Sequence, residues 1–195
     1  MRLIDRLVIE TEREHQAADE ETLQLLHAVT PSVYRRYLMR THGFVLPVER
    51  ALAATRDLER VIDVRRFTKH DLLRRDLQSF RMTDADLEQL PVCDIPKFRS
   101  PEQALGWAFV VERSTLSHAN MFRHLASVMP GDVAFTSTYL KCYAGTIGEQ
   151  WETFGDALEA VASSEAHIAH AIDAARTAFR THRAWRVRFD DTVAD

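Results

Sequence analysis

The run from Ala104 to Leu125, ALGWAFVVERSTLSHANMFRHL, constrains this chain most, because it has the length of a core helix yet carries small and polar residues where such a helix normally carries bulk. Read as a helix, it places one mixed set of side chains on a single face, since residues three and four apart lie on the same side. The members of this face are Val110, Arg113, Ser114, Ser117, His118 and Met121. A face that is half apolar and half hydrogen-bonding suits the wall of a pocket.

The remainder of the chain also favours helices. Only six glycines and six prolines interrupt its 195 residues, and no alternation of apolar and polar residues is long enough to predict a strand. Apolar residues make up 46% and charged residues 28%, which is typical of a soluble globular protein with one core. We therefore expect an all-α, single-domain bundle over residues 1–188, followed by a loose tail over residues 189–195.

Charge and hydropathy exclude several classes of function. The formal net charge is −4, and the basic residues are spread along the chain, which argues against nucleic-acid binding. No apolar run approaches the roughly 20 residues that cross a membrane, and the first residues turn acidic where a signal peptide stays apolar. Cys93 and Cys142 have no metal-binding spacing. These features predict a cytoplasmic protein with two unpaired thiols and no membrane or nucleic-acid partner.

The N-terminal stretch predicts a helix from about Leu3 to Leu26. Its inward stripe at 100° per residue consists of Ile4, Val8, Thr11, His15, Thr22 and Leu26. His15 therefore faces the core, where a histidine is more often a hydrogen-bonded packing residue than a ligand.

Capping signals predict the next helices. Thr30 as N-cap and Pro31 at the first helical position start a helix to about Thr55, with a bend or local unwinding around residues 42–44 and at Pro47. Farther along, Thr68 with Asp71 resembles a capping box that starts a helix over Lys69 to Phe80. Thr83 with Asp86 is expected to cap a short helix to Gln89, and Ser100-Pro101 with Gln103 starts the central run. The intervening arginines are expected on a solvated face: Arg65, Arg66, Arg74 and Arg75.

Within the central run, the order Gly-x-x-aromatic-Val-x-Glu-x-Ser-Thr-Leu resembles the distal helix of bacterial heme oxygenases, the kind often encoded beside bacteriophytochromes. The matching residues are Gly106, Phe109, Val110, Glu112, Ser114, Thr115 and Leu116. The family's first-helix pattern Thr-x-x-x-His is matched by Thr11 and His15. Likenesses in the second helix and near the C-terminus extend the resemblance over nearly the whole chain: Tyr34, Tyr37, Leu38, Val48, Glu49, Trp151, Phe154, Leu158, Phe179 and Trp185.

This resemblance implies a heme oxygenase-like fold in which heme is both cofactor and substrate. The implied products are biliverdin, carbon monoxide and ferrous iron, with electrons from a separate reductase or ferredoxin and a bacteriophytochrome as a further partner. His15 is then the proximal iron ligand. Ser114 and Ser117 are the implied catalytic residues, because Ser114 can anchor water that delivers protons. The other implied heme contacts are Thr11, Phe109, Val110, Arg113 and His118.

The central run departs from the family at three positions. The family usually carries glycine at the places of Arg113, Ser117 and His118, so that bare backbone approaches the heme. Side chains there could narrow the oxygen site, and His118 could ligate the iron opposite His15. These departures leave open an alternative function, a catalytically impaired member that binds heme or a bilin. The candidates for the propionates are Arg6, Arg13, Lys141 and Arg176.

Two other enzyme classes would require different residues. An enzyme like thiaminase II, from the same superfamily, would need Cys142 as a nucleophile near carboxylates, and the residues around it fit poorly. A di-iron carboxylate enzyme would need two Glu-x-x-His pairs with further glutamates. Glu12 and His15 form one such pair, and the sequence offers no second.

Overall fold

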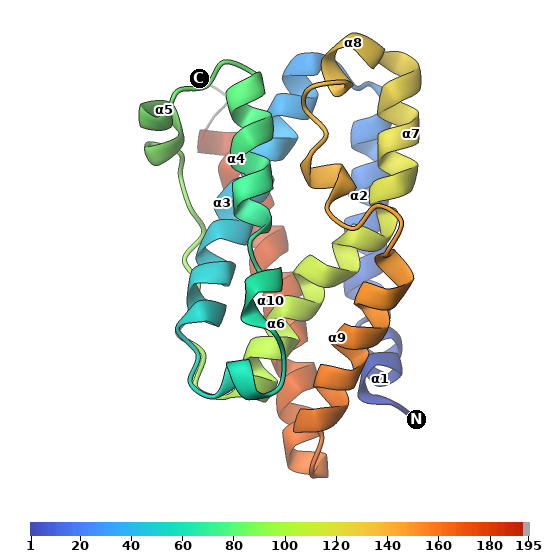
Figure 1. Ribbon diagram of the computed structural model, residues 1–195, viewed down its shortest axis with the longest axis vertical. Coiled ribbons are helices and arrows are strands. Elements are labelled where there is room, and N and C mark those ends of the chain that lie inside the picture. The colour runs from blue at the N-terminus through green and yellow to red at the C-terminus, as the bar shows by residue number, and fades with distance from the viewer. Residues whose placement is uncertain (193–195) are drawn as a thin grey trace.

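The computed structural model describes residues 1–192, apart from the side chains of Glu21, residues 23–26 and residues 191–192. Leu26, expected on the inward stripe of the first helix, is thus outside the described side chains. The described chain is helical and contains no strand, which confirms the all-α expectation (Figure 1). Its elements are α1 Leu3–Glu10, α2 Glu12–His27, α3 Pro31–Ala53, η1 Leu58–Arg60, η2 Val64–Arg66, α4 Lys69–Ser79, α5 Asp84–Glu88, α6 Pro101–Ser114, η3 Thr115–Ser117, α7 His118–Val128, α8 Pro130–Val133, η4 Tyr139–Lys141, α9 Ile147–Val161 and α10 Glu165–Thr192.

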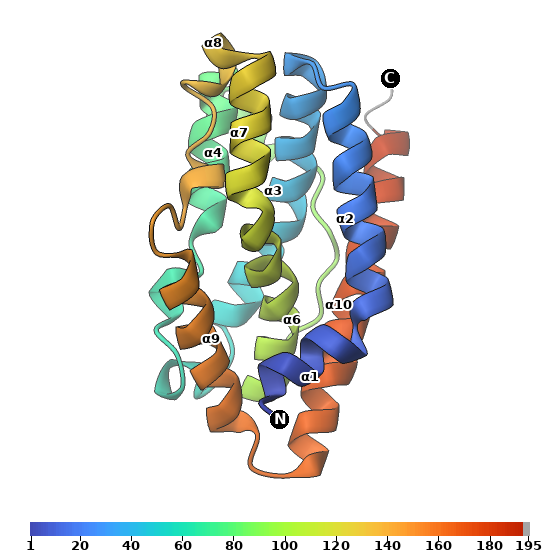
Figure 2. The same cartoon turned by 90° about the vertical axis from the view of Figure 1, so that its right-hand side faces the viewer.

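The helix α6 lies inside the bundle, and α10 packs along it more closely than any other pair of helices (Figures 1 and 2). Gly106 permits this pairing, because a Cβ there would lie 2.4 Å from the carbonyl oxygen of Ala171 and 2.7 Å from the Cβ of Ala174. Ser100 caps α6 as expected, accepting a hydrogen bond from the Gln103 amide.

The expected first helix is two helices that meet at Thr11, and Figure 2 shows the change of direction between them. The Thr11 hydroxyl donates to the carbonyl of Leu7 at 2.7 Å, which satisfies one of the α1 carbonyls at the junction. Leu7 is fully buried, whereas Val8, expected on the inward stripe, is exposed. The break therefore shifts which residues face the core on either side of it.

The central run is also interrupted. It consists of α6, one 3₁₀ turn, η3, and then α7. A 3₁₀ turn advances about 120° per residue instead of about 100°, so three such residues rotate the faces of α7 by roughly 60° relative to α6. His118 therefore does not continue the face that carries Val110 and Ser114.

By contrast, α3 runs without interruption from Pro31 to Ala53, and the local unwinding expected near Gly43 does not occur. Gly43 serves a close contact instead, because a Cβ there would lie 2.5 Å from the ring of Trp185 and 2.6 Å from the Pro91 carbonyl oxygen. The Trp185 indole N–H donates to the carbonyl of Arg40 at 2.9 Å. Thr30 caps this helix as predicted.

At its C-terminal end, α10 continues to Thr192, beyond residue 188 where the sequence placed the start of a loose tail. Phe189 explains the difference, since it is fully buried and its ring centroid lies 5.4 Å from that of Trp185. Among the helices that the structure describes, none is long and apolar enough to cross a membrane.

Candidate functional site

A cavity of about 80 Å³ lies where α2, α3, α6 and α10 meet. Each helix contributes to its wall. The principal lining residues are Ala18 and Asp19 of α2, Phe44 of α3, Val110, Arg113 and Ser114 of α6, Ser117 of η3, and Phe179 and His182 of α10. We call this space and its rim the α2–α6 cleft.

His15 lies beside the α2–α6 cleft, with both ring nitrogens engaged and 8% of its surface exposed. Its Nε2 lies 3.1 Å from the carbonyl oxygen of Val8, and its Nδ1 lies 2.9 Å from Nη2 of Arg113. A guanidinium only donates, so Nδ1 is the acceptor and Nε2 carries the proton given to Val8. The imidazole is therefore neutral and held from two sides.

Arg113 reaches from α6 across the cleft to α2. Its two terminal nitrogens lie 3.1 and 2.9 Å from the carboxylate oxygens of Asp19, in addition to the contact with His15. Such a bidentate pair fixes the guanidinium in position as well as in charge. The 80 Å³ cavity adjoins a hollow of about 300 Å³, and Arg113, Asp19, Thr22 and Ser117 line both.

Some of the other predicted residues of the central run line the cavity, and one lies in the hydrophobic core behind it. Val110, Ser114 and Ser117 line the cavity. The Ser114 hydroxyl donates to the Val111 carbonyl at 2.7 Å, and the Ser117 hydroxyl to the Ser114 carbonyl at 2.9 Å. Phe109 lies behind this wall, fully buried against the rings of Trp151 and Phe179.

His118 does not line the α2–α6 cleft. It lies on another side of α7, where its ring packs against Tyr139 at 4.6 Å and its Nδ1 is 3.7 Å from the Cys142 sulfur. Burial, together with the nearby charge of Lys69, lowers the pKa of His118 to about 3. The structure thus does not bring His118 opposite His15, because η3 has rotated it away.

Sequence reasoning missed several residues of α10. His182 lines the cavity, with its ring 4.7 Å from that of Phe44, and burial together with Arg186 and Arg40 lowers its pKa to about 3. Arg180 and Arg183 line an adjoining hollow of about 280 Å³ with Arg13 of α2. The spacing of Phe179, His182, Arg183 and Arg186 by three and four could have revealed this face.

Four cations were the sequence candidates for the propionates. Of these four, only Arg13 lines one of the three adjoining hollows of about 80, 280 and 300 Å³. Arg6 pairs with Glu10 and Glu165, and Arg176 also contacts Glu10. Lys141 lies over the ring of Phe122, on another part of the molecule.

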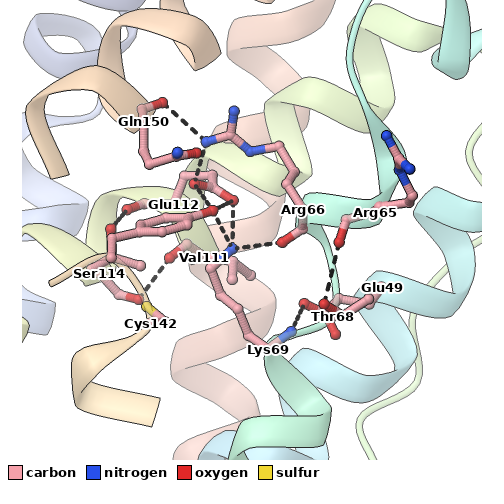
Figure 3. A network of polar contacts seen from close by, with 12 residues as sticks. Glu49, Arg65, Arg66, Thr68, Lys69, Val111, Glu112, Ser114, Cys142 and Gln150 are labelled. Carbon is pink, nitrogen blue, oxygen red and sulfur yellow. Dashed lines mark hydrogen bonds and ion pairs between the residues drawn. The ribbon is translucent and has the colours of Figure 1, made fainter. Parts of the chain in front are cut away.

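A buried polar cluster supports α6 from the side away from His15 (Figure 3). The Glu112 carboxylate accepts from Lys69 Nζ at 2.7 Å, from Arg66 Nη2 at 3.0 Å and from the Tyr143 hydroxyl at 3.1 Å. Arg66, expected on a solvated face, is therefore almost fully buried, because a carboxylate on α6 compensates its charge. Arg65, from the same expected face, remains exposed and pairs with Asp63.

The rival enzyme classes find little support. Burial raises the pKa of the Cys142 thiol to about 11, so the thiol stays protonated and is a poor nucleophile. Among the residues whose side chains are described, no three histidines, cysteines or carboxylates gather into a metal site. Glu12 is exposed, and its predicted partner His15 contacts Arg113 instead.

Residues 1–187 match the heme oxygenase family. The chain belongs to this family. The solved structure of the NO- and CO-bound heme oxygenase from Neisseria meningitidis has the same fold, with a TM-score of 0.76 at 21% identity over 98% of this chain and 92% of that one. A search of curated proteins finds no match. Heme oxygenases bind heme as both substrate and prosthetic group, which makes this protein a heme-binding member of a family of heme-degrading enzymes.

The residue types in and beside the α2–α6 cleft suit heme binding. His15 offers a neutral imidazole, Val110, Phe44 and Phe179 offer apolar walls, and cations lie at the rim. The volume of the cavity does not fit heme, because 80 Å³ is below the roughly 300–1,000 Å³ of small-molecule sites. Arg113 lines both this cavity and the neighbouring hollow of about 300 Å³.

Proposed function

We propose that this protein cleaves heme to biliverdin, carbon monoxide and ferrous iron, with electrons from an external reductase or ferredoxin. One observation supports this most: His15 on α2 lies beside the cavity that α6 helps to line, and Arg113 of α6 contacts it at 2.9 Å. Heme, when bound, supplies the iron that activates dioxygen and the ring that is oxidised. A bacteriophytochrome in the same cytoplasm is the proposed recipient of the biliverdin.

His15 is the proposed iron ligand. To expose the Nε2 lone pair, the imidazole must leave the Val8 carbonyl and carry its proton on Nδ1 instead. A protonated Nδ1 cannot accept from Arg113, so ligation and the Arg113 contact exclude one another. Thr11 holds the junction between α1 and α2, and thereby places His15.

The α6 side supplies the proposed distal wall. Val110 presents an apolar surface backed by Phe109. Ser114 and Ser117 already donate to backbone carbonyls, which leaves each hydroxyl oxygen free to accept from water. Water held there can pass protons toward the reacting centre, and this is the catalytic role proposed for both serines.

The rim cations are the proposed propionate contacts. Arg13, Arg180 and Arg183 line one hollow that adjoins the cavity through Ala18, Phe179 and His182. A guanidinium can bind a carboxylate through two parallel hydrogen bonds, which also orients the bound molecule.

A second candidate function is heme or bilin binding without turnover. The position of Arg113 favours it, because a guanidinium held by Asp19 and His15 occupies the space that heme needs. An Arg113 that returned to the cleft after heme had bound would obstruct the oxygen site.

One titration separates the two functions. Purified protein is titrated with hemin, then ascorbate or a reductase system is added under air, in the wild type, in His15→Ala and in the matched control His27→Ala, which alters an exposed histidine on the same helix. Loss of the Soret band with growth of a biliverdin band, suppressed in His15→Ala alone, supports the oxygenase. A stable Soret band supports the binding protein, and no hemin binding refutes both.

A further inference from the structure

A second cavity, of about 470 Å³, lies between α7, η4 and the start of α9. It shares no lining residue with the 80 Å³ cavity of the α2–α6 cleft. Its size falls within the range of small-molecule sites. We call it the α7 cavity.

The α7 cavity contains a buried polar group that lacks a partner. His118 is 3% exposed and its Nε2 makes no hydrogen bond. The other ring nitrogen, Nδ1, lies 3.7 Å from the Cys142 sulfur, and the ring also bonds to the Tyr139 backbone. A buried polar atom without a partner, such as this Nε2, is rare in folded proteins.

The wall of the α7 cavity is apolar with cations at its rim. Leu116, Phe122, Leu140 and Ile147 provide the apolar surface. The exposed residues Arg123 and Lys141 lie at the edge, with the Lys141 ammonium 4.5 Å from the centroid of the Phe122 ring. None of the described residues that line this cavity carries a carboxylate.

A buried polar cluster lies beneath the cavity. Tyr143 lines the cavity and accepts from Lys69 at 2.9 Å, while Lys69 and Arg66 both pair with Glu112. Glu49, whose carboxylate accepts from the Lys69 amide, is a second anion of this cluster. An anion in the α7 cavity therefore meets favourable charge at the rim.

From these features we propose that the α7 cavity binds a small amphiphilic carboxylate. Its apolar body lies against Leu116 and Phe122, and its carboxylate pairs with Lys141 and Arg123 at the rim. The chemistry matches on each side, since an apolar wall with a few convergent donors recognises an acid with an apolar body. This site shares no lining residue with the 80 Å³ cavity and only Leu116 with the hollow of about 300 Å³, so either proposal can fail without the other.

Decanoate is the test ligand, and decylamine, with the same chain length and the opposite charge, is its control. Calorimetry on Cys93→Ser protein should show decanoate binding at least tenfold tighter than decylamine. Saturating decanoate should slow N-ethylmaleimide labelling of Cys142, the one remaining thiol, about tenfold. Hemin affinity should be unchanged by decanoate.

Two exposed positions supply matched variants. Ala119→Trp fills the cavity from its edge and should weaken decanoate binding about tenfold while leaving hemin affinity unchanged. Lys141→Gln should weaken decanoate about threefold to fivefold, the effect expected of one partly solvated ion pair. Equal affinity for decanoate and decylamine, unprotected Cys142, or competition between decanoate and hemin would each overturn the proposal.

Discussion

Nη2 of Arg113 lies 2.9 Å from Nδ1 of His15, so a residue on the distal side of the cleft is hydrogen-bonded to the expected proximal ligand. The same guanidinium binds Asp19, four residues after His15 on α2. Arg113 thus closes the cleft by joining its two walls. In the proposed complex, heme replaces this internal contact, and the heme affinity is then reduced by the free energy of the contact.

Arg113→Ala should therefore accelerate hemin association severalfold. The variant removes the side chain that links α6 to α2, and it should also lower the free energy of unfolding of the heme-free protein by about 1 kcal/mol. Stopped-flow absorbance at the Soret band measures the first effect, and urea unfolding the second.

The matched control is Arg123→Ala, which removes an exposed arginine from the next helix. It should leave hemin association unchanged. A slower association in Arg113→Ala would mean that this arginine attracts or holds heme instead of excluding it.

Several helix starts were predictable from local chemistry. Thr30, Thr83 and Ser100 cap as the sequence indicates, because an N-cap depends on residues within one turn. The capping box expected at Thr68 does not form, since its side chain makes no cap bond. The position of His15 next to the cleft also follows from its helix, and the family pattern predicted that α6 lies opposite.

The features that could not be predicted depend on distant partners. Nothing near Arg66 in the sequence reveals Glu112, which lies 46 residues away and makes its burial possible. Likewise, η3 has no local signal such as glycine or proline, yet it rotates His118 out of the cleft. Contacts across the fold override the local pattern at both places.

Gly106→Val should destabilise the bundle strongly. A Cβ at this position already overlaps the carbonyl oxygen of Ala171 and the Cβ of Ala174 on α10, so α6 and α10 must move apart. We expect a loss of about 3 kcal/mol in the free energy of unfolding, the upper range for overpacking. Urea unfolding followed by circular dichroism measures it.

Gly148→Ala is the paired control, because a Cβ at Gly148, in the first turn of α9, meets no atom within 4 Å. The free energy of unfolding of Gly148→Ala should stay the same or rise by up to about 1 kcal/mol, since alanine favours the helix. Similar effects from the two substitutions would show that α6 and α10 do not pack in close contact at Gly106.

Glu112→Gln should be far more damaging than the loss of a surface carboxylate. It leaves Lys69 and Arg66 buried without the charge that compensates them, at a cost of about 3–5 kcal/mol. Adding Lys69→Met should recover part of that loss, because one uncompensated cation is removed. Glu152→Gln, which breaks an exposed pair with Arg2, should change the free energy of unfolding by less than about 1 kcal/mol.

Urea unfolding of these four proteins forms the test. If Glu112→Gln and Glu152→Gln lower the free energy of unfolding by the same small amount, water reaches the cluster around Glu112 and screens its charges. The double variant tests whether any change at Glu112 is simply disruptive, since disruption alone predicts a further loss and not a recovery.

Acid should unfold this protein partly through His118. Its pKa is about 3 in the folded chain, with Lys69, Cys142 and Tyr139 around it, against about 6.5 when unfolded. Below pH 6.5 the unfolded chain binds a proton that the folded chain does not, so the free energy of unfolding decreases as pH falls. The contribution from this one group is about 3 kcal/mol between pH 7.5 and pH 4.5, because one pH unit corresponds to about 1.4 kcal/mol. His42 and His182 act in the same direction.

The measurement compares urea unfolding at pH 7.5 and pH 4.5 in the wild type, His118→Asn and the exposed control His27→Asn. The difference between the two pH values should shrink by about 3 kcal/mol in His118→Asn and stay the same in His27→Asn. Because the comparison uses the change with pH, a loss of packing in His118→Asn cancels between the two conditions. An undiminished pH dependence in that variant would mean that His118 takes up a proton in the folded protein, where a carboxylate or a water within the α7 cavity stabilises its charged form.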